Sequence, residues 1–207
     1  QGGAGFIVPK NGYLKKVKQR CEEVGALLIV DEIQTGIGRT GKFWGFEHFK
    51  IIPDIIISGK GLGGGMPIGA FIAQKNLMDV LKEHPTLGHI TTFGGHPVIA
   101  SAGVATVNTI QNSTLIEDTL EKEQLIRSLL KHPLIKEIRG KGLMLAVLVE
   151  SPEIAAKIIH RCLANGLILF FLLFEGRAIR ITPPLTISKK EISKGCKILL
   201  ETLDELS

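Results

Sequence analysis

Residues 54–65 of the chain read DIIISGKGLGGG, in which Lys60 stands between glycines directly after an apolar run. The run at residues 54–58 predicts a buried strand, and the glycines allow close backbone approach and unusual dihedral angles. An amine held at the C-terminal end of a strand in an α/β sheet is placed to meet a ligand. The alternative is a glycine-rich surface loop with an incidental lysine, and this stretch alone does not separate the two interpretations.

Two further apolar runs lie on either side of this stretch, at residues 26–30 (ALLIV), directly before Asp31, and at residues 69–73 (GAFIA). Continuous apolar runs of this length, rather than strict alternation, favour strands that are covered on both faces. Residues 12–24 have the periodicity of an amphipathic helix, and a long helical stretch covers residues 98–112. Such a mixture of strands and helices predicts an α/β layer architecture.

The pattern changes in the second half of the chain, where short strands and helices alternate. We therefore expect two domains, with residues 1–112 forming part of a large domain and residues 113–207 forming a small α+β domain. The elements expected in the second half are helices at 114–131, 152–165 and 189–206 and strands at 142–149 and 178–182.

Composition limits the classes of function. A chain of 207 residues with 44% hydrophobic content can form one large domain or two small ones. The net charge of +5 is scattered, and the basic residues between Lys10 and Arg20 are followed by Glu22 and Glu23 on a helical segment. This favours a solvated helix face over a nucleic-acid surface. The aromatic content of 5% gives no sign of a base-stacking surface.

The three cysteines, Cys21, Cys162 and Cys196, are odd in number and widely spaced. Neither a disulfide framework nor a zinc site fits this spacing, so each cysteine is expected to be a small buried hydrophobic residue. The longest apolar run, residues 166–174, is too short to span a bilayer as a helix, which needs about 20 residues. No signal peptide is recognised, so a cytoplasmic protein is the default expectation.

Two motifs suggest a P-loop nucleotide hydrolase. Residues 27–32 (LLIVDE) resemble a Walker B strand, and residues 36–42 (GIGRTGK) match the spacing of a Walker A loop. However, Phe43 stands where the magnesium ligand should be serine or threonine. A single strand would also have to serve both motifs. These conflicts disfavour the hydrolase interpretation.

Pyridoxal phosphate chemistry joins Asp31 to Lys60. A lysine amine forms an imine with the aldehyde of this cofactor. A carboxylate keeps the pyridine nitrogen protonated, so that the ring can withdraw electrons. Both residues follow predicted parallel strands, at the edge where an α/β sheet binds ligands.

The chain resembles the class III aminotransferases, which include ornithine, acetylornithine, 4-aminobutyrate and putrescine aminotransferases. Asp31 and Lys60 are 29 residues apart, the spacing that such enzymes show. The resemblance implies a fold-type I pyridoxal phosphate transferase, with part of a large domain that has a mostly parallel sheet and a small C-terminal α+β domain. The blocks that carry it are DEIQTG (31–36), GRTG (38–41), PDI (53–55), GKGLGGG (59–65), TTFGGHP (91–97) and AIRITPPL (178–185).

The resemblance also implies roles for single residues, with no metal ion. Lys60 would be the Schiff-base lysine and would carry the proton during transamination, and Asp31 would pair with the pyridine nitrogen. Arg180 would bind a substrate carboxylate through a bidentate fork. The remaining roles are packing of Ile33 on the ring, contact of Gln34 with the phenolic oxygen, and contact of Thr92 with the cofactor phosphate of a neighbouring subunit, which implies a homodimer.

Each of these residues also has a purely structural interpretation. Arg180 lies between two isoleucines and could be an outward strand residue in an ion pair. Thr92 could neighbour a helix N-cap, and Gln34 could be an ordinary loop residue. Glu32 is expected to order the local backbone, and His96, which precedes a proline, is expected to lie in a turn.

The chain departs from the family in two respects. The earlier half of the family's sequence is absent, and with it a glycine-threonine or glycine-serine phosphate turn and an aromatic residue that stacks on the ring. We therefore expect weak or no activity from this chain alone. In addition, many members that act on ω-amines read Gln-Gly-Glu where this chain has Gly3, and that glutamate can pair with the arginine. Its absence would leave Arg180 available and shift specificity away from ornithine.

The predicted reaction is transfer of an amino group from an amino acid or ω-amine to a 2-oxo acid, with 2-oxoglutarate as the expected acceptor. The mechanism would be ping-pong, through a pyridoxamine form. An aminomutase, racemase or decarboxylase of the same fold remains an alternative, because these enzymes use the same lysine and aspartate. A catalytically silent fragment that serves in folding or assembly is a further alternative.

Overall fold

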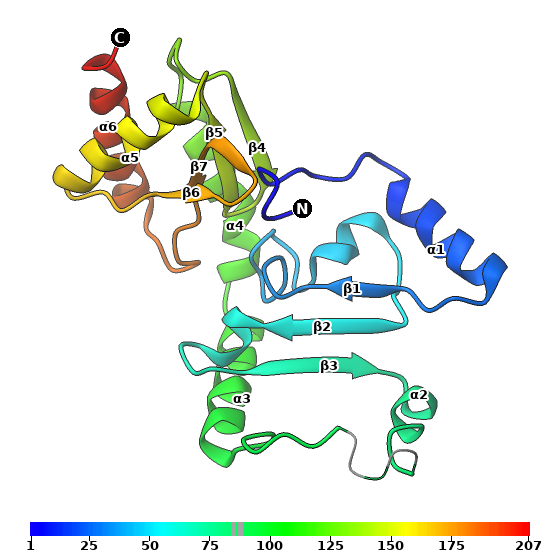
Figure 1. Cartoon of the computed structure of the whole chain (residues 1–207). Coiled ribbons are helices and arrows are strands. Elements are labelled where there is room, and N and C mark those ends of the chain that lie inside the picture. The colour runs from blue at the N-terminus through cyan, green and yellow to red at the C-terminus, as the bar shows by residue number, and fades with distance from the viewer. Residues whose placement is uncertain (84–85, 87–88) are drawn as a thin grey trace. The chain divides into compact units, whose positions relative to one another are not determined.

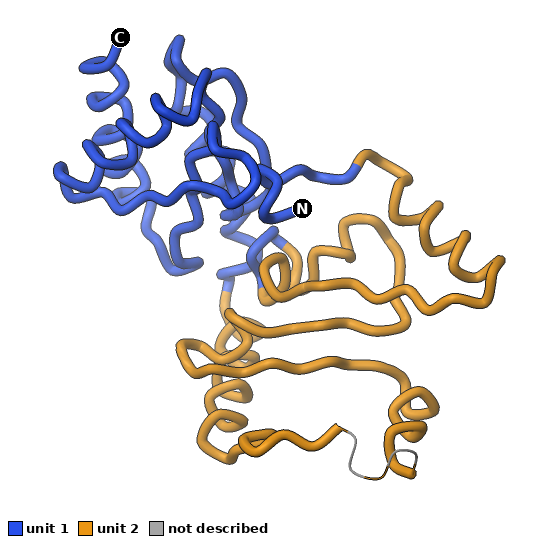
Figure 2. Tube along the Cα trace, viewed as in Figure 1, with its two compact units in different colours: residues 1–9, 38–41, 114–207 blue, residues 10–37, 42–113 orange. Residues whose placement is uncertain are grey.

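The structure of the chain is a computed structural model, which describes residues 1–83, 86 and 89–207. Its residues form two compact units, coloured separately in Figure 2. Unit 1 comprises residues 1–9, 38–41 and 114–207, and unit 2 comprises residues 10–37 and 42–113. The second half of the chain thus groups with two short segments from the first half. The expected domains 1–112 and 113–207 stay a prediction.

Unit 2 is built on a sheet in the order β1-β2-β3 (Figure 1), with bounds Ile29–Asp31, Ile55–Gly59 and Gly69–Ala73. Strands β1 and β2 are parallel, whereas β3 runs antiparallel to β2. The three expected strands are present, although β1 begins three residues later than its apolar run. The other elements of unit 2 are α1 (Tyr13–Val24), η1 (Gly45–Phe49), η2 (Lys60–Gly63), α2 (Lys75–Asp79) and α3 (Pro97–Gln111).

The core of unit 2 lies on one face of this sheet. Leu28, Phe46 and Ile51 are buried there, and Val30 and Ile56 pack against them. The opposite face is open in this chain, because Ile29 is 52% exposed and Phe71 45% exposed. The expectation of strands covered on both faces was therefore wrong for the part of the sheet that the structure describes. Ile55 and Ile57 of β2, which share this face, are half-buried.

Unit 1 contains an antiparallel sheet in the order β4-β5-β7-β6. Alternate side chains of β5 pack on its two faces: Leu145 and Val147 lie in the core formed with the helices, and Ala146 lies with Phe6 on the other face. Alternation of this kind is expected for a strand buried on both sides. The elements of unit 1 are α4 (Leu115–Leu129), β4 (Glu137–Lys141), β5 (Met144–Leu148), α5 (Pro152–Ala164), β6 (Phe170–Leu172), β7 (Glu175–Ile181) and α6 (Lys189–Asp204).

Local signals explain where the helices of unit 1 begin. The Ser151 side chain accepts a hydrogen bond from the Ile154 N–H, and Pro152 follows at the first helical position of α5. Ser188 and Glu191 form a reciprocal capping box at the start of α6. Both helices were expected from the sequence, and each begins and ends within two residues of its expected bounds.

The cysteines carry no disulfide, and Cys162 and Cys196 are buried while Cys21 is half-buried. Burial raises the pKa of the Cys196 thiol to about 11, which agrees with the expectation of an inert hydrophobic residue. Within the described residues, no helix is long and apolar enough to cross a membrane.

Candidate functional site

Asp31 and Lys60 follow neighbouring parallel strands of unit 2. The Cα of Asp31 pairs with that of Ile57 across β1 and β2, and Lys60 comes directly after Gly59, the last residue of β2. The prediction that both residues lie at the C-terminal ends of parallel strands is therefore confirmed (Figure 1). This edge of a parallel sheet is where α/β proteins bind ligands.

The two carboxylates that follow β1 have different environments. Oδ1 of Asp31 accepts the Ile33 N–H at 2.9 Å, and the Asp31 side chain stays exposed. Glu32 is only 1% exposed, and its carboxylate accepts from the Thr35 hydroxyl at 2.5 Å and from the N–H groups of Gly45 and Phe46 at 2.9 and 2.8 Å. Glu32 thus orders the loop and the start of η1, as expected. Among the described residues, the second oxygen of Asp31 has no hydrogen-bond partner and is available to a ligand.

The loop after β1 lies along the chain segment that contains Lys60. A Cβ built on Gly59 would lie 3.6 Å from Cγ2 of Ile33, and one on Gly61 would lie 3.5 Å from Cβ of Ile37. Ile33 is therefore beside the residue that precedes Lys60. Gln34 is exposed in the same loop. The structure thus brings Asp31, Ile33 and the backbone of Lys60 together.

Lys60 has an unusual backbone conformation. Its φ of 42° lies in the left-handed region, which L-amino acids with a side chain seldom adopt. Its side chain is exposed, and its amine has no hydrogen bond or ion pair among the residues that the structure describes. Strained residues of this kind cluster at functional sites. A strained lysine with a free amine at a strand end has the features expected of a nucleophile.

The glycine-rich segment after Lys60 packs against α3. Gly64 has a φ of 57°, and a Cβ there would lie 2.2 Å from Oγ1 of Thr106 on α3. A Cβ on Gly103 would lie 3.4 Å from the side chain of Ile68. Glycine at position 64 is therefore required both by the backbone angle and by the close approach of the helix. This packing fixes the segment that begins at Lys60.

Thr92 lies in an exposed turn at residues 92–95, before α3 begins at Pro97. No hydrogen bond or ion pair joins it to Lys60 or Asp31 within the described chain. Its role at a neighbouring subunit stays a prediction. His96 occupies the N-cap position of α3 and therefore lies in the turn, as expected.

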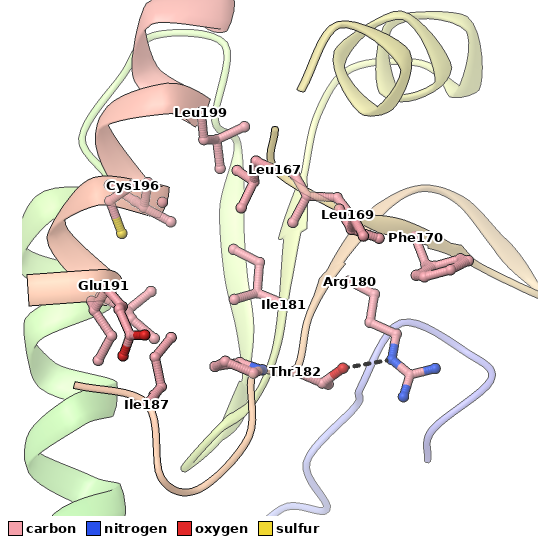
Figure 3. A pocket seen from close by; sticks show the side chains of 16 residues that line it. Leu167, Leu169, Phe170, Arg180, Ile181, Thr182, Ile187, Glu191, Cys196 and Leu199 are labelled. Atoms are coloured by element: carbon pink, nitrogen blue, oxygen red, sulfur yellow. Dashed lines mark hydrogen bonds between the residues drawn. The ribbon is translucent and has the colours of Figure 1, made fainter. Parts of the chain in front are cut away.

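Arg180 belongs to unit 1, on strand β7. Its Nε donates to Oγ1 of Thr182 at 2.9 Å, and no described carboxylate forms an ion pair with it. Figure 3 shows the arginine side chain extending away from Leu199 and Cys196. Arg180 nevertheless lines an apolar cavity of about 350 Å³ together with Leu199, Cys196 and Ile181. The structural interpretation of Arg180 as half of an ion pair is not supported in this chain.

Sequence reasoning missed two polar residues. Ser58 is 1% exposed, and its Oγ makes no hydrogen bond among the described residues, two positions before Lys60. The sequence feature that could have identified Ser58 is its hydroxyl at the end of an otherwise apolar run. Arg39 is half-buried in unit 1. Arg39 was overlooked as a separate candidate because the sequence around it matched a phosphate-binding loop.

The Walker A interpretation of residues 36–42 was wrong. Residues 38–41 pack within unit 1, where a Cβ on Gly41 would lie 2.7 Å from Leu120. Gly38 and Gly41 have φ angles of 84° and 86°. The Leu143 N–H also donates to the carbonyl of Arg39 at 3.0 Å. The glycines therefore serve a turn and close packing rather than phosphate binding.

Known proteins provide an independent comparison. A family model described as aminotransferase class-III matches residues 1–203. The putrescine aminotransferase of Pectobacterium atrosepticum is 41% identical over 214 residues, covering 100% of this chain and 46% of that protein. The leucine/methionine racemase of Thermococcus litoralis is 41% identical over 208 residues, covering 94% of this chain and 46% of that protein.

Solved structures agree in fold. The ornithine aminotransferase of Toxoplasma gondii matches with a TM-score of 0.91 and 35% identity, over 99% of this chain and 49% of that one. Its description reports partial occupancy of pyridoxal phosphate at the active site. The chain spans about half the length of the curated relatives it matches.

Proposed function

The chain belongs to the class-III aminotransferase family, and from this membership we propose that it is the part of a pyridoxal-phosphate-dependent aminotransferase that carries the cofactor lysine, Lys60. The observation that supports this most directly is the position of Asp31 and Lys60 after adjacent parallel strands. No other described side chain forms a hydrogen bond or an ion pair with the Lys60 amine or with the Asp31 carboxylate.

The residues present fit pyridoxal phosphate in their chemistry. When bound, this cofactor supplies an aldehyde that condenses with amines and a ring that withdraws electrons. The exposed amine of Lys60 would hold the aldehyde end. The free oxygen of Asp31 would hold the ring nitrogen in its protonated form, while the Ile33 N–H fixes the other oxygen. Ile33 would cover one face of the ring, and Gln34 would reach its phenolic oxygen.

Proton transfer at the substrate is the task of Lys60. Its amine would take the proton from the substrate Cα and return it one atom away, at the carbon through which the cofactor would be held. The left-handed backbone of Lys60, with a φ of 42°, places this side chain directly after the end of β2. In unit 1, the fork of Arg180 would bind a substrate carboxylate. The donor class is an amino acid or ω-amine, and the proposed acceptor is 2-oxoglutarate.

The proposal includes a homodimer, in which Thr92 of each subunit contacts the cofactor phosphate of the other. Its exposure in a turn leaves the hydroxyl accessible to a partner. A cytoplasmic location, the default expectation from the sequence, completes the proposal.

Covalent trapping tests the role of Lys60. The chain is incubated with pyridoxal phosphate, reduced with borohydride and mapped by mass spectrometry. We expect Lys60 to be labelled in preference to the other exposed lysines. Lys42→Ala, which removes an exposed lysine outside the site, should leave this labelling intact, and Asp31→Asn should weaken it. Equal labelling of all exposed lysines would contradict the proposal.

Racemisation is a second candidate, since a relative named a leucine/methionine racemase is as similar as the putrescine aminotransferase. The two reactions differ in their need for an acceptor. A racemase inverts an amino acid without any 2-oxo acid, whereas a transaminase exchanges the amino group. Incubation of the complete enzyme with L-leucine alone, followed by chiral chromatography, distinguishes them: D-leucine without an acceptor would favour the racemase.

A further inference from the structure

Arg39 lies close to the segment that follows Arg180, within unit 1. Nη1 of Arg39 donates to the carbonyl of Pro183 at 2.6 Å and to that of Leu143 at 3.1 Å. Pro183 is three residues after Arg180. The Arg39 side chain therefore ties the end of β7 to the β4–β5 turn.

Both guanidinium groups keep unused hydrogen-bond donors. Within the part of the chain that the structure describes, Arg180 uses only Nε, in its bond to Thr182, and Arg39 uses only Nη1, in bonds to carbonyl oxygens. Each arginine thus retains one planar edge with two free nitrogens, the geometry that matches a carboxylate. Among the described residues, no aspartate or glutamate forms an ion pair with either arginine.

The two positive charges also influence each other. Burial lowers the pKa of the Arg39 guanidinium, and the charge of Arg180 lowers it further. Two cations held near each other without an acidic partner repel, and a bound anion relieves this repulsion. The Arg39 guanidinium is stabilised by two carbonyl oxygens but by no described carboxylate, so a bound anion would add the charge compensation that these contacts do not supply.

We propose that Arg39 is a second determinant of carboxylate recognition at Arg180: it positions the segment that contains Pro183, and its charge strengthens binding of a dicarboxylate. This inference rests on the proposed role of Arg180. It assigns to residues 38–41 a contribution to substrate binding as well as to packing. The dicarboxylate is the acceptor class already proposed, and the inference adds Arg39 to the residues that recognise it.

A purely structural role is the competing explanation. If Arg39 only ties Pro183 to Leu143, its loss would lower the stability of unit 1 without changing ligand affinity or its dependence on salt. Arg39→Lys and Arg39→Gln separate the two explanations. The lysine keeps the charge, whereas the glutamine keeps a hydrogen-bond donor and loses the charge.

The test uses the whole chain without cofactor and glutarate as the probe. NMR signals of the arginine Nε–H groups are followed during titration, at low and at high salt. We expect the signals of Arg39 and Arg180 to shift together. Arg39→Gln should weaken glutarate binding about threefold to tenfold and flatten its salt dependence, while Arg39→Lys should retain most of the affinity.

Two further variants complete the experiment. Arg161→Gln removes an exposed arginine of unit 1 that pairs with Glu205, and it should bind glutarate as the unchanged chain does. Arg180→Gln should abolish binding. If Arg39→Gln binds as tightly as the unchanged chain with the same salt dependence, the inference is wrong and the proposed function stands. If Arg180→Gln also binds normally, or the unchanged chain shows no saturable shift, the proposed role of Arg180 fails as well.

Discussion

The Phe174 N–H donates a hydrogen bond to the carbonyl oxygen of Gly3 at 2.9 Å, and the ring of Phe174 lies over the Gly3 Cα. A Cβ built on Gly3 would be 3.0 Å from Cδ2 of that ring. Position 3 therefore has little room for the glutamate that the family resemblance would place there. The ring itself is 84% exposed and can turn away.

Gly3→Glu tests this crowding. We expect it to lower the free energy of unfolding by about 1 kcal/mol, the lower end of the cost of overpacking, because the ring is free to move. Urea denaturation measures the change. Phe174→Ala in the same background should remove most of the cost, and an equal cost with and without Phe174 would show that crowding is not its source.

The same substitution tests specificity in the complete enzyme. A glutamate at position 3 could pair with Arg180 and compete with substrate carboxylates, so kcat/KM for α-amino acids should fall relative to that for ornithine. An unchanged ratio would mean that Gly3 does not set the donor preference.

The backbone of Lys60 is expected to store strain. With a φ of 42°, a side chain costs about 1 kcal/mol relative to glycine. Lys60→Gly should therefore be more stable than Lys60→Ala by about that amount, although both lose the amine. Comparison of their urea midpoints checks this. Equal midpoints would indicate that the left-handed conformation carries no measurable penalty.

The carboxylate of Glu32 should be among the most sensitive groups of unit 2. Glu32→Gln places an amide NH₂ where three donors converge, so we expect a loss of about 2 kcal/mol or more. Glu47→Gln is the matched control, because Glu47 is exposed and accepts one bond, from the Trp44 N–H. Similar losses for both variants would refute a special role for the buried carboxylate.

Acid sensitivity is expected at Asp54. Its bond from the Leu28 N–H, followed by the Lys18 ammonium at 2.9 Å, holds the pKa of Asp54 below its usual value. The folded state then binds a proton less readily than the unfolded state. The stabilisation is present above pH about 3.9 and is lost as the pH falls through the lower pKa of the folded protein.

Asp54→Asn should therefore show a shallower loss of stability below pH about 4 than the unchanged chain does, as measured by thermal unfolding across a pH series. Glu117→Gln, at an exposed acid of α4, should follow the unchanged chain. Identical acid profiles for Asp54→Asn and the unchanged chain would contradict the assignment.

Gly142→Ala should damage unit 1. Gly142 has a φ of 61°, and a Cβ there would lie 2.7 Å from backbone atoms of Arg39 and Thr40. Backbone atoms cannot give way as a side-chain end can, so we expect a cost of about 3 kcal/mol. Gly166→Ala has a φ of 84° but open space, so its cost should stay near about 1 kcal/mol. Equal costs would show that the backbone angle alone matters.

The sequence predicted the elements with strong local signals. The helices α3, α5 and α6 and the strands β2, β3 and β5 were expected within a few residues of their bounds. The strands β4 and β6 were missed. Strand β4 reads EIRGK, in which charges and a glycine hide any alternation, and β6 has three residues inside a longer apolar run. Both owe their structure to pairing with β5 and β7.

The candidate site was predicted in part. Strand ends and spacing pointed to Asp31 and Lys60, and their placement was confirmed. Arg39 could not be predicted, because its partners Leu143 and Pro183 are 104 and 144 residues away in the chain. No local pattern encodes contacts of that range. The glycines of residues 36–42 suggested a phosphate-binding loop, whereas in the structure Gly38 and Gly41 adopt the positive φ angles of a turn.

The membership of residues 38–41 in unit 1 has a consequence for biosynthesis. The ribosome releases these residues long before Leu143 and Pro183, their hydrogen-bond partners. The hydrogen bonds between Arg39 and these residues can therefore both be present only after residue 183 has been synthesised. Contacts between such distant residues slow folding. A nascent chain stalled before residue 143 should consequently be a better client for chaperones than the finished polypeptide.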